Sequence, residues 1–224
     1  MPHSEDNKKK TLLLVEGSND KALLNILALD LDLVNFLDVR SIGGIDNLKN
    51  HLQSIKNDLQ DYDFSNLGLI IDIDESEITE KINYIENSLK ILNFEFNNFD
   101  ENILETILIA EDALEIKVKV FFMSASNKKG ELIDLLKEIK LQPSDISDCA
   151  IKCLKKKGDS NDKELMDDWL HLYLKWDCSS RKDRKNGSKI GLDKEETKVR
   201  IKEMFDLQSE KLNPLKTYLT QFSN

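Results

Sequence analysis

The sequence predicts an α/β protein with a mainly parallel sheet flanked by helices and with a helical extension on its C-terminal side. Two apolar runs, Leu12–Glu16 and Gly68–Asp72, each stop abruptly at carboxylates. Strands that are buried on both faces of a parallel sheet have continuous apolar runs of this kind. Between these runs, apolar residues recur at helical spacing. Alternation of strand and helix is typical of parallel sheets with right-handed crossovers.

The elements within residues 11–140 follow from the spacing of apolar residues and from the turn and cap residues between them. In order, they are a strand at 11–16, a helix capped by Asn19 or Asp20, a strand at 36–41, a turn at Gly43-Gly44, a helix at 47–60 capped by Asp46, a strand at 67–73, a helix at 77–93, β-prone segments at 103–109 and 116–123, and a helix at 131–139 that Gly130 opens. These elements predict one α/β domain, and we expect residues 1–10 before it to be a disordered tail.

Residues 141–224 predict a helical extension packed on the same domain. The expected elements are helices at 144–156 and 162–177, a charged loop at 180–192, and a helical region at 193–222 that Pro214 breaks into two. Within the second helix, an apolar stripe is made by Trp169, Leu172, Tyr173 and Trp176. Such a stripe favours a place in the core over a platform for base stacking.

The composition favours a globular protein of the cytoplasm. Hydrophobic residues make up 40% of the 224 residues, which is enough for a core, and charged residues make up 33%. No apolar stretch approaches the ~18 residues of a membrane span, and Met1–Lys10 lacks the apolar segment of a secretory signal. The three cysteines, Cys149, Cys153 and Cys178, complete no zinc set, so we expect reduced thiols.

The charge of the chain argues against a uniformly basic surface for nucleic acid. The formal net charge is −10, whereas neutralisation of phosphate requires Lys and Arg. Two local basic runs, 155–157 and 181–189, depart from this balance. The second is loop-like and has the charge to contact phosphate, although a solvated surface loop is its simpler interpretation. The sequence indicates no oligomeric state.

Glu16, Gly17 and Asp20 follow the first predicted strand. Gly17 permits a tight turn from strand to helix that a Cβ would obstruct. Glu16 ends a buried run and therefore requires a partner or solvent. Asp20 is favourable near a helix N-terminus, so an ordinary capped turn also explains this motif.

Asp72 and Asp74 end the second run and point to the same side of the strand. Because groups at the carboxyl ends of parallel strands face the ligand crevice, we expect both aspartates to meet Glu16 at one edge of the sheet. Three anions without a nearby fixed cation repel one another. A hard divalent ion such as Mg²⁺ would relieve that repulsion, because it takes oxygen ligands and keeps several waters. The alternative is that the aspartates are exposed just beyond the strand.

Together, the two motifs resemble a known family. The residues that carry the resemblance are Glu16, Gly17 and Asp20 after one strand, then Asp72 and Asp74 after a later one. This combination is similar to the Toprim domain of bacterial primases, topoisomerases and overcoming-lysogenization-defect nucleases. The resemblance covers about residues 11–140 and implies a Rossmannoid fold. The remainder is similar to small stand-alone Toprim-like proteins.

The resemblance implies a Mg²⁺-dependent phosphodiesterase that is nuclease-like on DNA or RNA. Glu16 would be a metal ligand or general acid/base, while Asp72 and Asp74 would hold Mg²⁺, with Mn²⁺ as a substitute. Gly17 would shape the turn, and Asp20 would support the site. The ion would bind the scissile phosphate, orient water and neutralise developing charge. By analogy with fused relatives, the resemblance also implies a partner ATPase.

One later helix departs from the family pattern. Stand-alone relatives carry a Gly-x-Leu-Glu signature there, and in this chain Ile133 stands at the position of that Glu. Glu131 or Asp134 is the candidate substitute. Lys128 and Lys129 precede this turn and are candidate phosphate contacts, although exposed lysines are the simpler interpretation.

Two other functional classes stay open. A catalytically inactive Toprim-like module, which binds or regulates in a nucleic-acid-processing or defence system, is favoured by Ile133 and by the net charge. A different enzyme could use the Asp-x-Asp pair, as haloacid-dehalogenase-type phosphatases and nucleotide-sugar transferases do. The phosphatases carry their pair on the first core strand, whereas Asp72 and Asp74 follow the third predicted strand here.

Overall fold

The computed structural model of the chain describes residues 10–60, 64–73, 78–92, 98–100, 103–109, 115–123, 130–157, 162–185 and 191–222. The predicted tail, residues 1–10, lies outside these ranges except for Lys10, which begins the first strand.

A six-stranded sheet has the strand order β2-β1-β3-β6-β5-β4. The strands are β1 (Lys10–Val15), β2 (Leu37–Ser41), β3 (Phe64–Asp72), β4 (Asn98–Asp100), β5 (Ile103–Ile109) and β6 (Glu115–Met123). The strands β2, β1, β3 and β6 are parallel, which confirms the predicted α/β class. Strands β5 and β4 are antiparallel additions. Residues 110–114 between β5 and β6 are too few for the crossover that a parallel pair requires.

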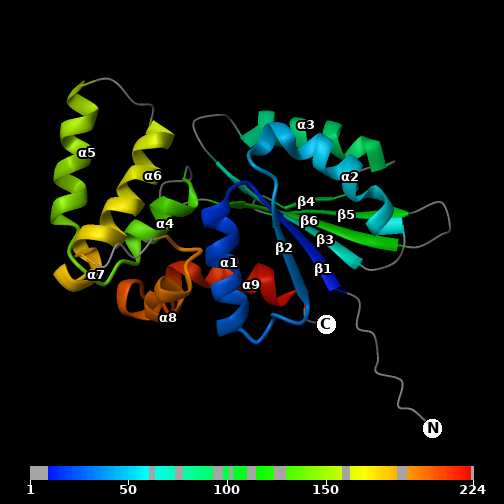
Figure 1. Cartoon of the computed structure of the whole chain (residues 1–224). Coiled ribbons are helices and arrows are strands. Elements are labelled where there is room, and N and C mark those ends of the chain that lie inside the picture. The colour runs from blue at the N-terminus through cyan, green and yellow to red at the C-terminus, as the bar shows by residue number, and fades with distance from the viewer. Residues whose placement is uncertain are drawn as a thin grey trace, which may run out of the picture.

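Helices cover both faces of the sheet (Figure 1). One face is covered by α2 (Leu48–Gln60) and α3 (Ile78–Leu89), whose buried residues share an apolar cluster with the strands. The other face is covered by α1 (Ser18–Asp30) and α9 (Asn213–Thr220). This arrangement explains why the central strands are apolar on both sides.

Strand β1 shows the two faces residue by residue. Leu12 and Leu14 belong to the cluster beneath α2 and α3. Leu13 and Val15 belong to the cluster beneath α1 and α9. All four side chains are fully buried, as a central strand of a two-sided parallel sheet requires.

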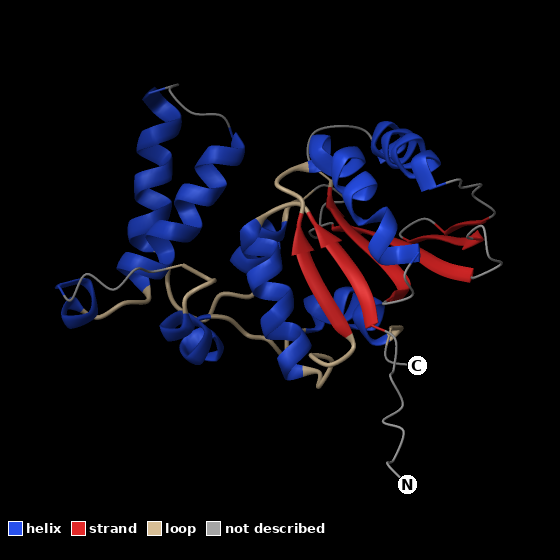
Figure 2. Cartoon of the chain, turned by 45° about the vertical axis from the view of Figure 1, so that its right-hand side comes forward, coloured by secondary structure: helices blue, strands red, loops and turns tan. Residues whose placement is uncertain are grey.

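The C-terminal part is helical and lies to one side of the sheet (Figures 1 and 2). The remaining helices are α4 (Leu132–Glu138), which precedes this part, and α5 (Asp145–Lys157), α6 (Asp162–Leu172), α7 (Arg181–Lys185) and α8 (Glu195–Met204) within it. One apolar cluster runs from the sheet into these helices and contains Leu13, Trp169 and Phe205. In the described part of the chain, no helix is long and apolar enough to cross a membrane.

Tyr218 anchors α9 to the centre of the sheet. Its hydroxyl lies 2.8 Å from the main-chain oxygen of Lys119 and 3.2 Å from that of Leu69. Its ring packs on Phe121 and Phe222, with ring centroids 5.2 and 5.1 Å away. A Cβ at Gly68 would lie 2.9 Å from the Tyr218 hydroxyl, so the glycine makes room for α9.

Two predictions for the C-terminal part need correction. The sequence predicts a loop at 180–192, whereas residues 181–185 form the short helix α7. The helical region 193–222 is interrupted at 205–212, before Pro214. Pro214 is the second residue of α9, where its missing N–H costs no helical hydrogen bond.

The prediction that Trp176 belongs to the apolar stripe is also wrong. Residues 173–177 form a π-helical turn, in which the Cys178 N–H donates to Tyr173 O at 2.9 Å. The extra residue rotates the following side chains around the helix axis. Trp169 and Tyr173 are therefore buried and stacked, whereas Trp176 is 41% exposed.

Candidate functional site

A cavity of about 500 Å³ lies at the carboxyl ends of β1, β2 and β3, where the chain turns into helices. Its lining residues come from the starts of α1 and α4, from the strand ends, and from α6. They are Glu16, Gly17, Ser18, Asn19, Asp20, Ser41, Gly43, Gly44, Asp72, Glu131, Leu132, Ile133 and Asp167. The sheet edge that the sequence predicted as the crevice therefore carries a cavity.

Glu16 joins the two central strands at this edge. Its side chain is 5% exposed, and its Oε1 accepts the Asp72 N–H at 3.0 Å. Its main-chain oxygen accepts the Gly44 N–H at 2.9 Å and lies 3.3 Å from the Ser41 hydroxyl. The predicted meeting of Glu16 and Asp72 is observed, since both are buried and both line the cavity.

Lys81 is one of two site residues that the sequence reasoning missed. Its ammonium donates to Asp72 O at 2.6 Å and lies 3.8 Å from Glu16 Oε1. The assumption that the acidic residues have no fixed cation nearby is therefore wrong. The sequence did contain a signal, because Lys81 is three residues after Ile78 and four before Ile85, on the apolar side of the predicted helix.

Asp20 and Asp134 have the same structural role in two helices. Asp20 Oδ2 accepts the N–H of Gly17, the N-cap of α1, at 2.6 Å. Asp134 Oδ2 accepts the N–H of Glu131, the N-cap of α4, at 3.2 Å. Each aspartate is the third residue of its helix and bonds back to the cap, as in the reciprocal half of a capping box. The predicted cap at Asn19 or Asp20 is thus corrected to Gly17.

The glycines at the site differ in what they contribute. Gly17 is extended, with φ −117°, a conformation open to any residue. A Cβ there would lie 3.2 Å from Asp20 Oδ2, so close packing is the reason for glycine. Gly43 and Gly44 have φ values of +73° and +103°, which side chains rarely adopt. The turn that they form directs the Gly44 N–H to the main-chain oxygen of Glu16.

The remaining predicted site residues are divided between the cavity and the undescribed segments. Ile133 is 5% exposed, lines the cavity and belongs to the apolar cluster. Glu131 also lines the cavity. Asp74, Lys128 and Lys129 lie outside the described residues. Within the described ranges, no three His, Cys, Asp or Glu side chains are grouped to hold a metal ion.

The helical part supplies one wall of the cavity. Asp167 on α6 lines it, and its Oδ1 accepts from the Asn19 side-chain amide at 3.2 Å. This hydrogen bond joins the first turn of α1 to α6 across a sequence separation of 148 residues. Local patterns carry no information on such a distant contact, so the sequence reasoning missed Asp167.

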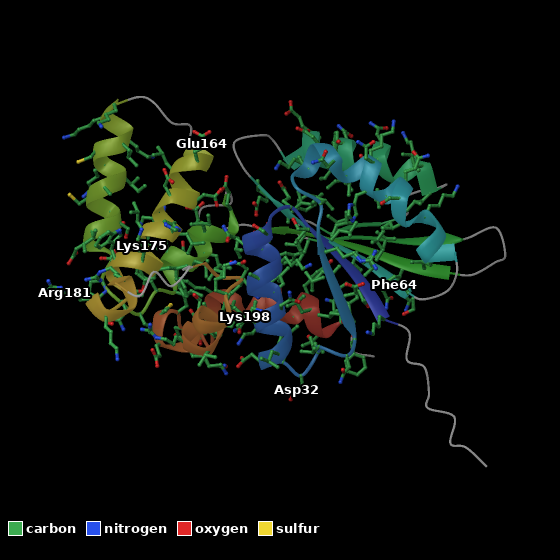
Figure 3. All side chains as sticks on the ribbon, in the orientation of Figure 1. Asp32, Phe64, Glu164, Lys175, Arg181 and Lys198 are labelled. Atoms are coloured by element: carbon green, nitrogen blue, oxygen red, sulfur yellow. The ribbon has the colours of Figure 1, made fainter. Side chains whose placement is uncertain are left out.

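An aromatic and basic surface lies on the helical part, separate from the cavity. Lys175 Nζ and the Arg184 guanidinium lie 5.7 and 5.1 Å from the centre of the exposed Trp176 ring. Arg181 and Lys182 are exposed on the neighbouring helix α7. Lys175 and Arg181 lie at the same end of the helical part (Figure 3). Arg184, in the predicted basic run 181–189, therefore packs on an aromatic ring.

The chain matches a protein family along almost its whole length. The family model described as "Protein of unknown function (DUF3226)" matches residues 10–224. A solved structure, the C-terminal region of the OLD protein of Xanthomonas campestris pv. campestris, is similar at 14% identity over 87% of this chain and 77% of that chain. Its TM-score of 0.35 is too low to support an argument about fold or function. No curated protein matches the chain.

Proposed function

The chain belongs to the DUF3226 family, and we propose that it is a Mg²⁺-dependent, Toprim-type phosphodiesterase that cleaves DNA or RNA. The proposal rests on the charge of the cavity. Five carboxylates line it, from Glu16, Asp20, Asp72, Glu131 and Asp167, and no described Lys or Arg does. Such a cavity attracts a cation and repels a bare phosphate, so a phosphate substrate requires a metal ion there.

Glu16, Asp72 and Asp74 would hold the ion. Carboxylate oxygens suit Mg²⁺, which is usually bound by one or two protein carboxylates and keeps several waters. Glu16 and Asp72 meet this requirement, since both are buried at the cavity. When bound, the ion would polarise the phosphodiester and lower the pKa of a water molecule. Mn²⁺ has similar ligand preferences and would substitute.

The first turn of α1 would bind the phosphate oxygens. The Lys21 N–H donates to Gly17 O at 3.2 Å, as the first bond of the helix. The N–H groups of Ser18 and Asn19 precede it and therefore have no acceptor within the helix. Both residues line the cavity. Oriented N–H groups and the helix dipole favour an anion there once the metal ion offsets the carboxylates.

The surface around Trp176 supports nucleic acid as the substrate class. An exposed ring with Lys175 and Arg184 over it presents aromatic and cationic groups together, as surfaces that bind single-stranded nucleic acid do. This basic surface covers only part of the molecule, so it is compatible with the net charge of −10 of the whole chain. A partner ATPase, by analogy with fused relatives, would supply further contacts to nucleic acid.

Mn²⁺ binding and oligonucleotide cleavage test the proposal together. Labelled single- and double-stranded DNA and RNA would be incubated with Mg²⁺ or Mn²⁺ and resolved on denaturing gels. We expect cleavage in the wild type, at least a 100-fold loss in Asp72→Asn and Asp74→Asn, and no loss in the control Asp168→Asn, which removes an exposed carboxylate outside the cavity lining. A wild type that neither binds Mn²⁺ nor cleaves any substrate would refute the proposal.

A catalytically inactive binding module is the second candidate. It is favoured by Ile133, which is apolar and buried where the stand-alone relatives carry a glutamate. The same experiment separates the two functions. Metal and nucleic acid binding that depend on Asp72, without cleavage under any condition, would favour the binding module.

A further inference from the structure

Lys81 lies behind the carboxylates that the proposed function assigns to a metal ion. Its side chain is 6% exposed, its ammonium donates to Asp72 O at 2.6 Å, and it lies 3.8 Å from Glu16 Oε1. Glu16 and Asp72 line the cavity, but Lys81 does not. An ion from solvent would therefore meet the two acidic residues from the cavity side, while the lysine charge stays in the protein interior.

The lysine fixes the orientation of Glu16. Oε1 faces the Lys81 ammonium and accepts the Asp72 N–H at 3.0 Å. The first interaction comes from α3 and the second from β3, so two elements hold one carboxylate oxygen. A carboxylate held in this way needs no metal ion to overcome repulsion from its acidic neighbours, because the Lys81 ammonium is already beside it.

Ile133 removes one ligand that a second ion at this cavity would need. Ile133 presents an aliphatic side chain where the family resemblance places a glutamate, and it is packed into the apolar cluster. A second divalent ion would also be repelled by both the first ion and the ammonium.

We propose that Lys81 is a positioning residue that takes the place of a second metal ion. The site would then bind one divalent ion per chain. This inference rests on the proposed function. Lys81 supplies one fixed positive charge at Glu16, and the single metal ion supplies the remaining positive charge on the cavity side. The lysine also sets the affinity of that ion, since a like charge within a few ångströms weakens cation binding.

Counting Mn²⁺ tests this proposal without any activity measurement. The signal of free Mn²⁺ in electron paramagnetic resonance is followed while the full chain is titrated with MnCl₂ at fixed ionic strength. We expect one ion per wild-type chain and the same count in Lys81→Arg, which keeps the charge. In Lys81→Met, we expect either a second ion or one ion bound about tenfold more tightly or better. The control Lys90→Met removes an exposed charge just after α3 and should match the wild type.

The outcomes separate the two proposals. A wild type that binds two ions, or a Lys81→Met variant with the count and affinity of Lys90→Met, would overturn the role of Lys81 and leave the proposed function intact. A wild type that binds no ion would overturn the proposed function itself. If Lys81→Met does not fold, the number of Mn²⁺ ions bound per chain by the wild type and by Lys81→Arg tests the proposal. Two bound ions in either protein would contradict a lysine that replaces a metal ion.

Discussion

The buried ion pair between Lys81 and Glu16 makes a quantitative prediction about stability. The two side chains are 6% and 5% exposed, and the charged atoms are 3.8 Å apart. At an effective dielectric constant of about 20, two unit charges at this distance attract by about 4 kcal/mol. Removing one partner of a buried pair leaves the other charge desolvated and costs about 3–5 kcal/mol, whereas removing both costs much less.

A double-mutant cycle measures this coupling. Glu16→Gln keeps an oxygen to accept the Asp72 N–H but removes the charge, and Lys81→Met removes the ammonium at similar length. In chelator, we expect each single variant to lower the free energy of urea unfolding by about 3–5 kcal/mol. The double variant should lose several kcal/mol less than the sum of the two, because neither charge is left unpaired.

The exposed pair between Lys211 and Glu138 is the control. Its atoms are closer, at 2.9 Å, but the side chains are 48% and 25% exposed. We expect the cycle of Lys211→Met and Glu138→Gln to give a coupling of at most about 1 kcal/mol, because solvent screens exposed pairs. A coupling this small for Lys81 and Glu16 would show that burial does not strengthen their interaction, and the reasoning about a fixed cation would fail.

Three further predictions concern the core and the helical part. Gly68→Ala should lower the free energy of unfolding, measured in urea, by about 1–3 kcal/mol, because the added methyl group must move the sheet or α9. An unchanged midpoint of urea unfolding would mean that α9 does not pack on the sheet at Gly68. Burial raises the pKa of Asp148, but hydrogen bonds from Ser144 and Trp169 outweigh it and hold the pKa below its ordinary value. The ionised side chain therefore stabilises the fold above the ordinary carboxyl pKa and loses this effect as acid protonates it. Because solvent screens this exposed side chain, Asp148→Ala should cost at most about 1 kcal/mol in urea unfolding at neutral pH, and less in acid; a cost independent of pH would contradict this. Burial raises the pKa of the Cys178 thiol to about 11. Alkylation at about pH 8, followed by mass spectrometry, should therefore be slow at Cys178 and fast at the two exposed cysteines of α5. Equal alkylation rates at all three cysteines would exclude a buried thiol.

The sequence predicted the central strands and the crevice well because their determinants are local. Buried strands such as β1 and β3 have uninterrupted apolar runs, and a carboxylate directly after such a run marks the strand end. The meeting of Glu16 with Asp72 then follows from the parallel arrangement alone. The short elements β4 and α7 were missed, since three to five residues give too little periodicity to detect.

Other features depend on contacts that periodicity does not encode. Trp176 has the spacing of a buried residue, yet one π-helical turn exposes it. Asp167 reaches the cavity only through the placement of α6 against α1. Lys81 differs from Trp176 and Asp167, because the sequence already places it on the apolar side of a predicted helix. A lysine at such a position implies a buried partner. The roles of Glu16, Asp72 and Asp74 in metal binding, and of Lys128 and Lys129 in phosphate binding, all stay predictions.

The packing of α9 on the sheet has a consequence for biosynthesis. A ribosome makes β1 and β3 long before α9, yet Tyr218 and Phe222 cover the strand surface at Gly68. A nascent chain that has not reached residue 213 therefore exposes an apolar sheet face, which favours aggregation or chaperone binding. The first strands to be translated thus complete their burial only after residue 222 has left the ribosome.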